Sequence, residues 1–235
     1  MDKIKLDENQ KRLDIDLWII MIVSFIILGI FIVFQKEIYG IIKNDKFPIL
    51  SRVLLAAFFQ YGFAGFGITI VSILRKEHFI FYGLKMKGMF LSILFCVLCF
   101  IPNIIFSYTL GQSNSYLPFQ TVLTTKEVLA SDFPINVIGM LITATAWGFF
   151  EGFNYVVISE KINRRYPTNY RWLNWGAIFC SVMCILIHGA VGVSFEGIIE
   201  MISIFIIIYG MLLAKEFTSN AWGCVFIFVF LWNAF

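Results

Sequence analysis

The sequence predicts an all-α, polytopic integral membrane protein with about seven transmembrane helices. Of its 235 residues, 60% are hydrophobic and only 14% are charged, and the mean hydropathy is +0.85. A soluble domain of this length would need more polar residues to cover its surface. The apolar residues gather into seven runs, each near the ~20 residues that cross ~30 Å of hydrocarbon as a helix.

An N-terminal tail at residues 1–16 mixes acids and bases and precedes the first apolar run. That run is longer than the apolar core of a signal peptide, so we interpret the tail as retained and cytosolic. No linker, tandem repeat or low-complexity tract divides the rest, which predicts a single transmembrane domain over residues 17–235. The expected helices cover residues 17–34, 50–74, 88–108, 133–158, 173–193, 197–214 and 221–235.

Individual runs carry further signals. The second contains LLAAFFQYGFAGFG, whose small residues favour close approach between helices. Gln60 within it either forms a hydrogen bond between helices or belongs to a functional site. In the third run, Pro102 predicts a kink. The long stretch 111–132 is expected to form an irregular or interfacial cap, and the last run is short for a crossing.

Lysine and arginine are distributed unequally between alternate loops. Of the 18 such residues, 13 fall on the face that holds the N-terminus and 5 on the other. Positive charge favours the cytoplasmic side, so we predict a cytoplasmic N-terminus in a multi-pass protein of the plasma membrane. The same distribution indicates topology and not nucleic-acid binding, and the lipid bilayer is the expected partner.

Glu151 stands in the apolar stretch WGFFEGFNYVVISEKINRR, and His188 stands in CSVMCILIHGAVG. Ionisable residues inside a membrane segment indicate function because a charge in hydrocarbon is costly. Counted from the basic loop between them, Glu151 lies roughly 21 Å deep and His188 roughly 25 Å deep. The two helices are expected to be antiparallel neighbours, so the side chains can meet.

Such a pair has three uses, and the residues alone leave all three open. Glu151 and His188 can hold a water as a general base with its partner, bind a metal such as zinc, or form a neutral structural hydrogen bond. Catalytic zinc usually has three protein ligands, for which Glu196 and Glu200 are candidates. The alternative places Glu196 at the water interface and Glu200, one turn deeper, in the lining of a cavity. Gly152 either opens space beside Glu151 or allows close helix packing.

The order and spacing of these residues resemble the CPBP intramembrane proteases, also called the CAAX-protease, bacteriocin-processing or Abi family. Its members carry EExxxR, then FxxxH, then HxxxN or HxxxD on successive helices. The stretch LRKEHFIFYGLKMK at 74–87 is similar to an amphipathic element that often precedes the family core. The resemblance covers about residues 74–235 and includes Glu151, His188 and Asn233.

The motifs depart from the family pattern. In one register Glu151 is the first Glu, Gly152 replaces the second and Val156 replaces the Arg; in the other, Phe150 and Tyr155 are the replacements. The second motif has Cys184 in place of Phe, and the third has Val229 in place of His. Only one acid of the pair and one of the two motif histidines therefore remain.

The resemblance implies catalytic roles for Glu151 and His188 in activating water, with Asn233 stabilising the oxyanion. It also implies zinc, with His188 and Glu151 as ligands, and a membrane-associated peptide or a prenylated or otherwise lipidated protein as substrate. The alternative is a catalytically inactive member that serves as a membrane binding module or bacteriocin self-immunity factor. A small-solute transporter is disfavoured because the sequence contains no inverted repeat.

Overall fold

The computed structural model describes residues 6–109, 115–189 and 191–235, and within them all regular structure is helical. Five continuous helices are long and apolar enough to cross a membrane, which makes the chain a multi-pass membrane protein. They are α1 (Glu8–Val33), the continuous helix Ile49–Arg75, α5 (Met89–Thr109), the continuous helix Ile135–Arg165 and α10 (Phe195–Thr218).

Two of these helices are continuous but not uniform. The helix at 49–75 consists of α3 (Ile49–Tyr61), the π-helical segment η1 (Gly62–Phe66) and α4 (Gly67–Arg75). The helix at 135–165 consists of α7 (Ile135–Thr143), the π-helical segment η3 (Ala144–Phe150) and α8 (Glu151–Arg165). The shorter elements are α2 (Gln35–Ile42), η2 (Phe79–Tyr82) and α6 (Thr125–Ala130).

The remaining two expected helices are too short to cross a membrane. Among the described residues the structure therefore has five candidate crossings, where the sequence predicted about seven. The segment at 173–193 forms α9 (Trp175–Ile187), which ends where Gly189 takes a positive φ of 64°. The last segment forms only α11 (Trp222–Phe230), and Cys224, Ile227 and Phe228 in it are fully buried. Both are shorter than a membrane crossing, and α11 is an inner helix covered by the others.

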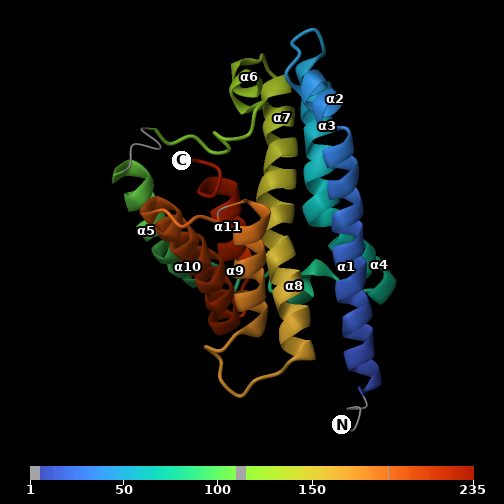
Figure 1. Cartoon of the computed structure of the whole chain (residues 1–235), viewed down its shortest axis with the longest axis vertical. Helices are drawn as coiled ribbons and strands as arrows, with labels where there is room; N and C mark the ends of the chain where they lie inside the picture. The colour runs from blue at the N-terminus through green and yellow to red at the C-terminus, as the bar shows by residue number, and fades with distance from the viewer. Residues whose placement is uncertain (1–5, 110–114, 190) are drawn as a thin grey trace.

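The helices run roughly along one axis, so the molecule has two ends (Figure 1). The lower end holds the start of α1 and the connection 166–174, and the upper end holds α2 and α6. Helix α1 begins at Glu8, with Asp7 as its capping residue, so part of the predicted tail is helical. Residues 1–5 of that tail, 111–114 of the predicted cap and residue 190 of the expected helix 173–193 lie outside the described residues.

Small residues bring α11 close to its neighbours. A Cβ atom on Gly223 would lie 2.5 Å from the backbone oxygen of Ser92 in α5, and one on Gly152 would lie 2.9 Å from that of Cys224. The Ser92 hydroxyl donates to the Asn220 carbonyl at 2.8 Å. The core thus forms where α5, α8 and α10 enclose α11, and it leaves α1 on the other side of α8 (Figure 1).

Candidate functional site

Glu151 lies where two long helices each contain a π-helical segment, whose turns are wider than those of an α-helix. It is the first residue of α8 and directly follows η3, while η1 interrupts the helix at 49–75. The two π-helical segments touch, since a Cβ atom on Gly65 would lie 2.7 Å from the ring of Phe150. Segments of this kind change the side-chain register within a helix and occur frequently at functional sites.

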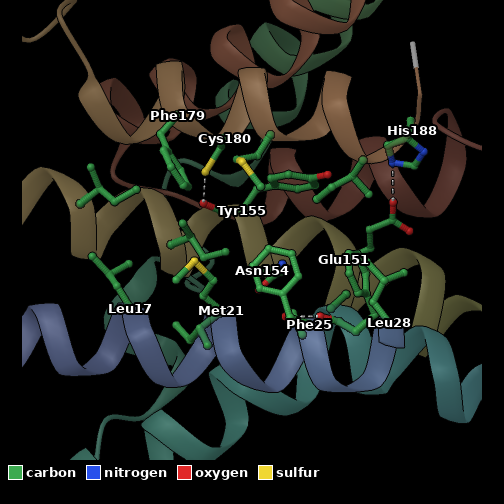
Figure 2. Close-up of a pocket in the computed structure, with 18 of the residues that line it drawn as sticks. Leu17, Met21, Phe25, Leu28, Glu151, Asn154, Tyr155, Phe179, Cys180 and His188 are labelled. Carbon is green, nitrogen blue, oxygen red and sulfur yellow. Dashed lines mark hydrogen bonds and ion pairs between the residues drawn. The ribbon is translucent and has the colours of Figure 1, made fainter. Parts of the chain in front are cut away.

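The carboxyl group of Glu151 has two polar neighbours from other helices. Gln60 Nε2 donates a hydrogen bond to Glu151 Oε2 at 2.7 Å, and His188 Nε2 lies 3.9 Å from Glu151 Oε1. Figure 2 shows the Glu151 and His188 side chains pointing toward one another. A separation of 3.9 Å is too long for a direct hydrogen bond but suits a bridging water that bonds to both atoms.

His188 is placed by the end of α9. Its backbone N–H still donates to the Cys184 carbonyl, and the positive φ of Gly189 then turns the chain away. The imidazole makes an edge contact with Trp232, with ring centroids 5.7 Å apart. The contact with Trp232 holds one side of the ring while the other side faces Glu151.

Asn233 lines the same cavity as Glu151 and His188 and is held by the segment before α6. The Thr121 hydroxyl donates to Asn233 Oδ1 at 2.9 Å, and the Thr121 backbone N–H donates to the Asn233 carbonyl at 3.2 Å. Asn233 Nδ2 is buried and has no hydrogen-bond partner among the described residues. A buried donor without a partner is costly, so this amide is available for a water or a bound ligand.

The cavity around these residues has a volume of about 680 Å³. Helix α1 forms one wall, α9 forms the other, and α8 lies between them (Figure 2). Most of its length is apolar. Gln60, Glu151, His188 and Asn233 form a polar group at one end, and Asp14 and Tyr166 line the other end. The apolar lining includes Leu17, Met21, Phe25, Leu28, Ile158, Ile162, Phe179, Met183 and Ile187.

A second cavity of about 350 Å³ lies nearer the upper end of the molecule. It is lined by parts of α1, α2 and α3 and by residues 121–124. Gln60, Trp147 and Asn233 line both cavities, so the two spaces meet beside the carboxyl group of Glu151. We call them the inner cavity and the outer cavity.

The residues present do not fit a zinc site with three protein ligands. Among the described parts of the chain, no three His, Cys, Asp or Glu residues come together. Glu196 and Glu200, the candidates for further ligands, are exposed on α10 and line neither cavity. Glu151 and His188 therefore remain a pair, and the mechanism considered below uses only the groups of this chain.

Several residues have roles that the sequence left open or did not reveal. Gln60 joins helices as expected, but its partner is Glu151 itself, so it also belongs to the site. Gly152 packs against α11 and does not open the cavity. Asn154 was not predicted: it lines the inner cavity, and its Oδ1 is buried without a partner among the described residues.

A buried ion-pair cluster fastens α1 to the rest of the molecule at the lower end. Asp16 pairs with Arg75 at 2.6 Å and with Lys161 at 2.9 Å. Lys161 also pairs with Glu77 at 3.0 Å, and Glu77 pairs with Arg12 at 2.9 Å. Because α1 forms a wall of the inner cavity, these contacts set how far that wall stands from α8.

Glu77 in this cluster also accepts a hydrogen bond from the Tyr82 hydroxyl at 2.5 Å. Burial by itself would raise the pKa of Glu77, but the hydrogen bonds from Tyr82 and Lys161 and the charges of Lys161 and Arg12 outweigh it. The pKa of Glu77 is therefore held below its usual value. Burial and the bond to Glu77 raise the pKa of Tyr82, so Tyr82 acts as the donor.

No protein-family model, curated protein or solved structure matches this chain. The likeness to the CPBP proteases thus rests on the motif-like residues alone.

Proposed function

We propose that the protein is a CPBP-like intramembrane endopeptidase of the plasma membrane that cleaves a membrane-associated or lipidated peptide. The observation that carries this proposal is the position of Glu151, beside His188 and bonded to Gln60, at one end of a mainly apolar cavity. The apolar length of the cavity suits a lipid chain or apolar side chains. In this proposal the lower end of the molecule faces the cytoplasm.

The reaction uses a water held between Glu151 Oε1 and His188 Nε2. Glu151 accepts a proton from this water while the water oxygen bonds to the carbonyl carbon of the peptide. Asn233 Nδ2, which has no hydrogen-bond partner in the part of the chain that the structure describes, donates to the oxyanion. The C–N bond then breaks, and the proton passes from Glu151 to the leaving nitrogen.

The test is cleavage of farnesylated and unmodified membrane-anchored peptides in liposomes that contain the purified protein, with products identified by mass spectrometry. Glu151→Gln removes the base and is expected to lower the cleavage rate at least 100-fold. His188→Ala is expected to lower it similarly. Glu200→Gln is the matched control, because Glu200 is exposed and lines neither cavity.

Equal cleavage by the wild type and Glu151→Gln would refute the proposal. Absence of products from the wild type with every peptide would favour a second candidate, a catalytically inactive binding module such as a bacteriocin self-immunity factor. The presence of one carboxyl and one imidazole where the family has pairs favours that candidate.

The binding module predicts a different pattern of variants. Met21→Trp fills part of the inner cavity, so it should abolish retention of a lipidated peptide by the purified protein, whereas Glu151→Gln should not. Ile22→Trp is the control on the same helix, because Ile22 is 51% exposed and does not line the cavity. Equal retention by Met21→Trp and Ile22→Trp would contradict the second candidate.

A further inference from the structure

The outer cavity reaches the surface of the molecule at the upper end. Residues 121–124 form part of its wall, and within that stretch Thr121 and Leu123 are exposed. From there the cavity passes Ala56 and Phe59 on α3 and arrives at Gln60 and Asn233, which also line the inner cavity. Space therefore continues from an exposed segment to the carboxyl group of Glu151.

Polar atoms without partners mark this path. Thr124 Oγ1 in the outer cavity, Asn233 Nδ2 where the cavities meet and Asn154 Oδ1 in the inner cavity are all buried and unpaired among the described residues. Buried polar atoms of native proteins are paired with protein or with ordered water. A cavity holds water when it is large enough and has polar partners, and both conditions are met here.

The apolar part of the inner cavity offers no comparable path. Between Leu17 and Leu28 its α1 wall presents Met21, Ser24 and Phe25, and the Ser24 hydroxyl is already used in a bond to the Phe63 carbonyl. Water that enters from the lower end, which Asp14 and Tyr166 line, would have to pass this apolar wall before it reached Asn154 and Glu151.

We infer that the outer cavity is a water-filled passage that supplies Glu151 and His188 from the upper end of the molecule. In the proposed hydrolysis, the inner cavity then holds the apolar part of the substrate, and the water that is consumed arrives from the opposite side. The passage depends on the shape and polarity of residues 121–124, α3 and Asn233, and its existence does not require that the protein is an active enzyme.

Cysteine accessibility tests this passage directly. A charged, membrane-impermeant methanethiosulfonate reacts with a thiol in water and not with one that faces lipid. Ala56→Cys places a thiol in the outer cavity, one helical turn from Gln60, and Leu54→Cys places one on the exposed surface of the same helix, where Leu54 is 55% exposed. The two thiols therefore lie at nearly the same depth along the helix, but one faces the outer cavity and the other the outer surface of the protein.

We expect the reagent to modify Ala56→Cys at least tenfold faster than Leu54→Cys when it is added on the side of α2 and α6. Peptide mass spectrometry locates the label and separates it from the five native cysteines. Gln60→Cys, where the two cavities meet, should also be labelled from that side, and adding Ala56→Trp should block it.

Labelling of Ala56→Cys no faster than Leu54→Cys, or labelling of Gln60→Cys only from the opposite side, would overturn the passage. The same measurement on Ala56→Cys combined with Glu151→Gln separates this inference from the proposed function. Labelling that persists in the double variant supports the passage whether or not peptides are cleaved. Cleavage that persists in the double variant, with labelling intact, would count against the proposed enzyme alone.

Discussion

Asp16 and Lys161 form an ion pair of 2.9 Å although both side chains are almost fully buried, at 1% and 2% exposure. They are 145 residues apart in the chain. The pair joins α1 to α8 beside the lower part of the inner cavity, and each partner has a further ionic contact, Asp16 with Arg75 and Lys161 with Glu77. Buried charges of this kind are tolerated only when their partners are present.

Loss of Lys161 should therefore destabilise the protein strongly. Lys161→Met leaves Asp16 buried with Arg75 as its remaining cation, so we expect a loss of about 3 kcal/mol, at the low end of the range for a broken buried pair. Thermal unfolding of the purified protein in detergent measures the change. Lys11→Met is the control, because the Lys11–Glu8 pair is exposed and should contribute less than about 1 kcal/mol.

The double variant Asp16→Leu with Lys161→Met separates the pair from general damage. The double variant removes both charges together, so neither is left buried without the other. Its loss of stability should therefore be smaller than the sum of the losses in the two single variants. Losses that simply add would show that the two residues do not interact across α1 and α8.

Glu77 should make the stability of the lower end depend on acidic pH. The pKa of Glu77 is lower in the folded protein than the ordinary value of 4.5 expected when unfolded, so the unfolded chain takes up the proton more readily. The stabilisation is complete above the unfolded-state pKa and is lost as the pH falls through the folded-state pKa. The stability difference between wild type and Glu77→Gln should therefore shrink below pH 4.5.

Thermal unfolding of the two proteins in parallel, from neutral pH downward, measures this difference. Acid titration of groups remote from Glu77 is common to both proteins and cancels in the comparison. A difference that stays constant through the acidic range would mean that Glu77 does not stabilise the fold through its charge.

Gly152 should be required for packing and not for cavity space. A Cβ atom there would lie 2.9 Å from the Cys224 carbonyl and 3.0 Å from the Phe228 ring, so Gly152→Ala forces α8 and α11 apart. We expect a loss of about 1–3 kcal/mol, the usual cost of overpacking. Reaction of the buried Cys224 with a thiol-specific fluorophore during heating reports the loss.

Gly29 provides the matched control for that substitution. No atom lies within 4 Å of the position of its Cβ, and alanine favours a helix over glycine by about 1 kcal/mol. Gly29→Ala should therefore leave the unfolding temperature unchanged or raise it. Equal unfolding temperatures for Gly152→Ala and Gly29→Ala would disprove the packing role.

The long helices could be predicted because each is a long run of apolar residues, and that property needs no knowledge of neighbours. The approach of Glu151 and His188 could also be predicted, because one short loop connects their two helices and the residues lie at similar distances from it. Glu200 was misplaced because helical spacing shows which residues share a face but not whether that face turns inward. Only the packing of α10 leaves Glu200 exposed.

The ion-pair cluster was beyond prediction for a related reason. By composition Asp16 belongs to the charged tail and Lys161 to the basic loop, where charged side chains are usually solvated. Their burial follows from the extension of α1 down to Glu8 and of α8 to Arg165, which brings the two ends together. The π-helical segments likewise have no signal in GFAGF or ATAWGFF, because they arise from packing between two helices.

The π-helical segment η3 also governs how the two halves of its helix can vary. It changes the angular phase between α7, where Gly139 packs against Val128, and α8, where Glu151 faces His188. Because a π-helical turn holds about one residue more than an α-helical turn, deleting a single residue from 144–150 would restore an ordinary α-helix and leave the two halves close to their present phase. The same deletion within α7 or α8 would instead turn the parts on either side of it by about 100° relative to one another.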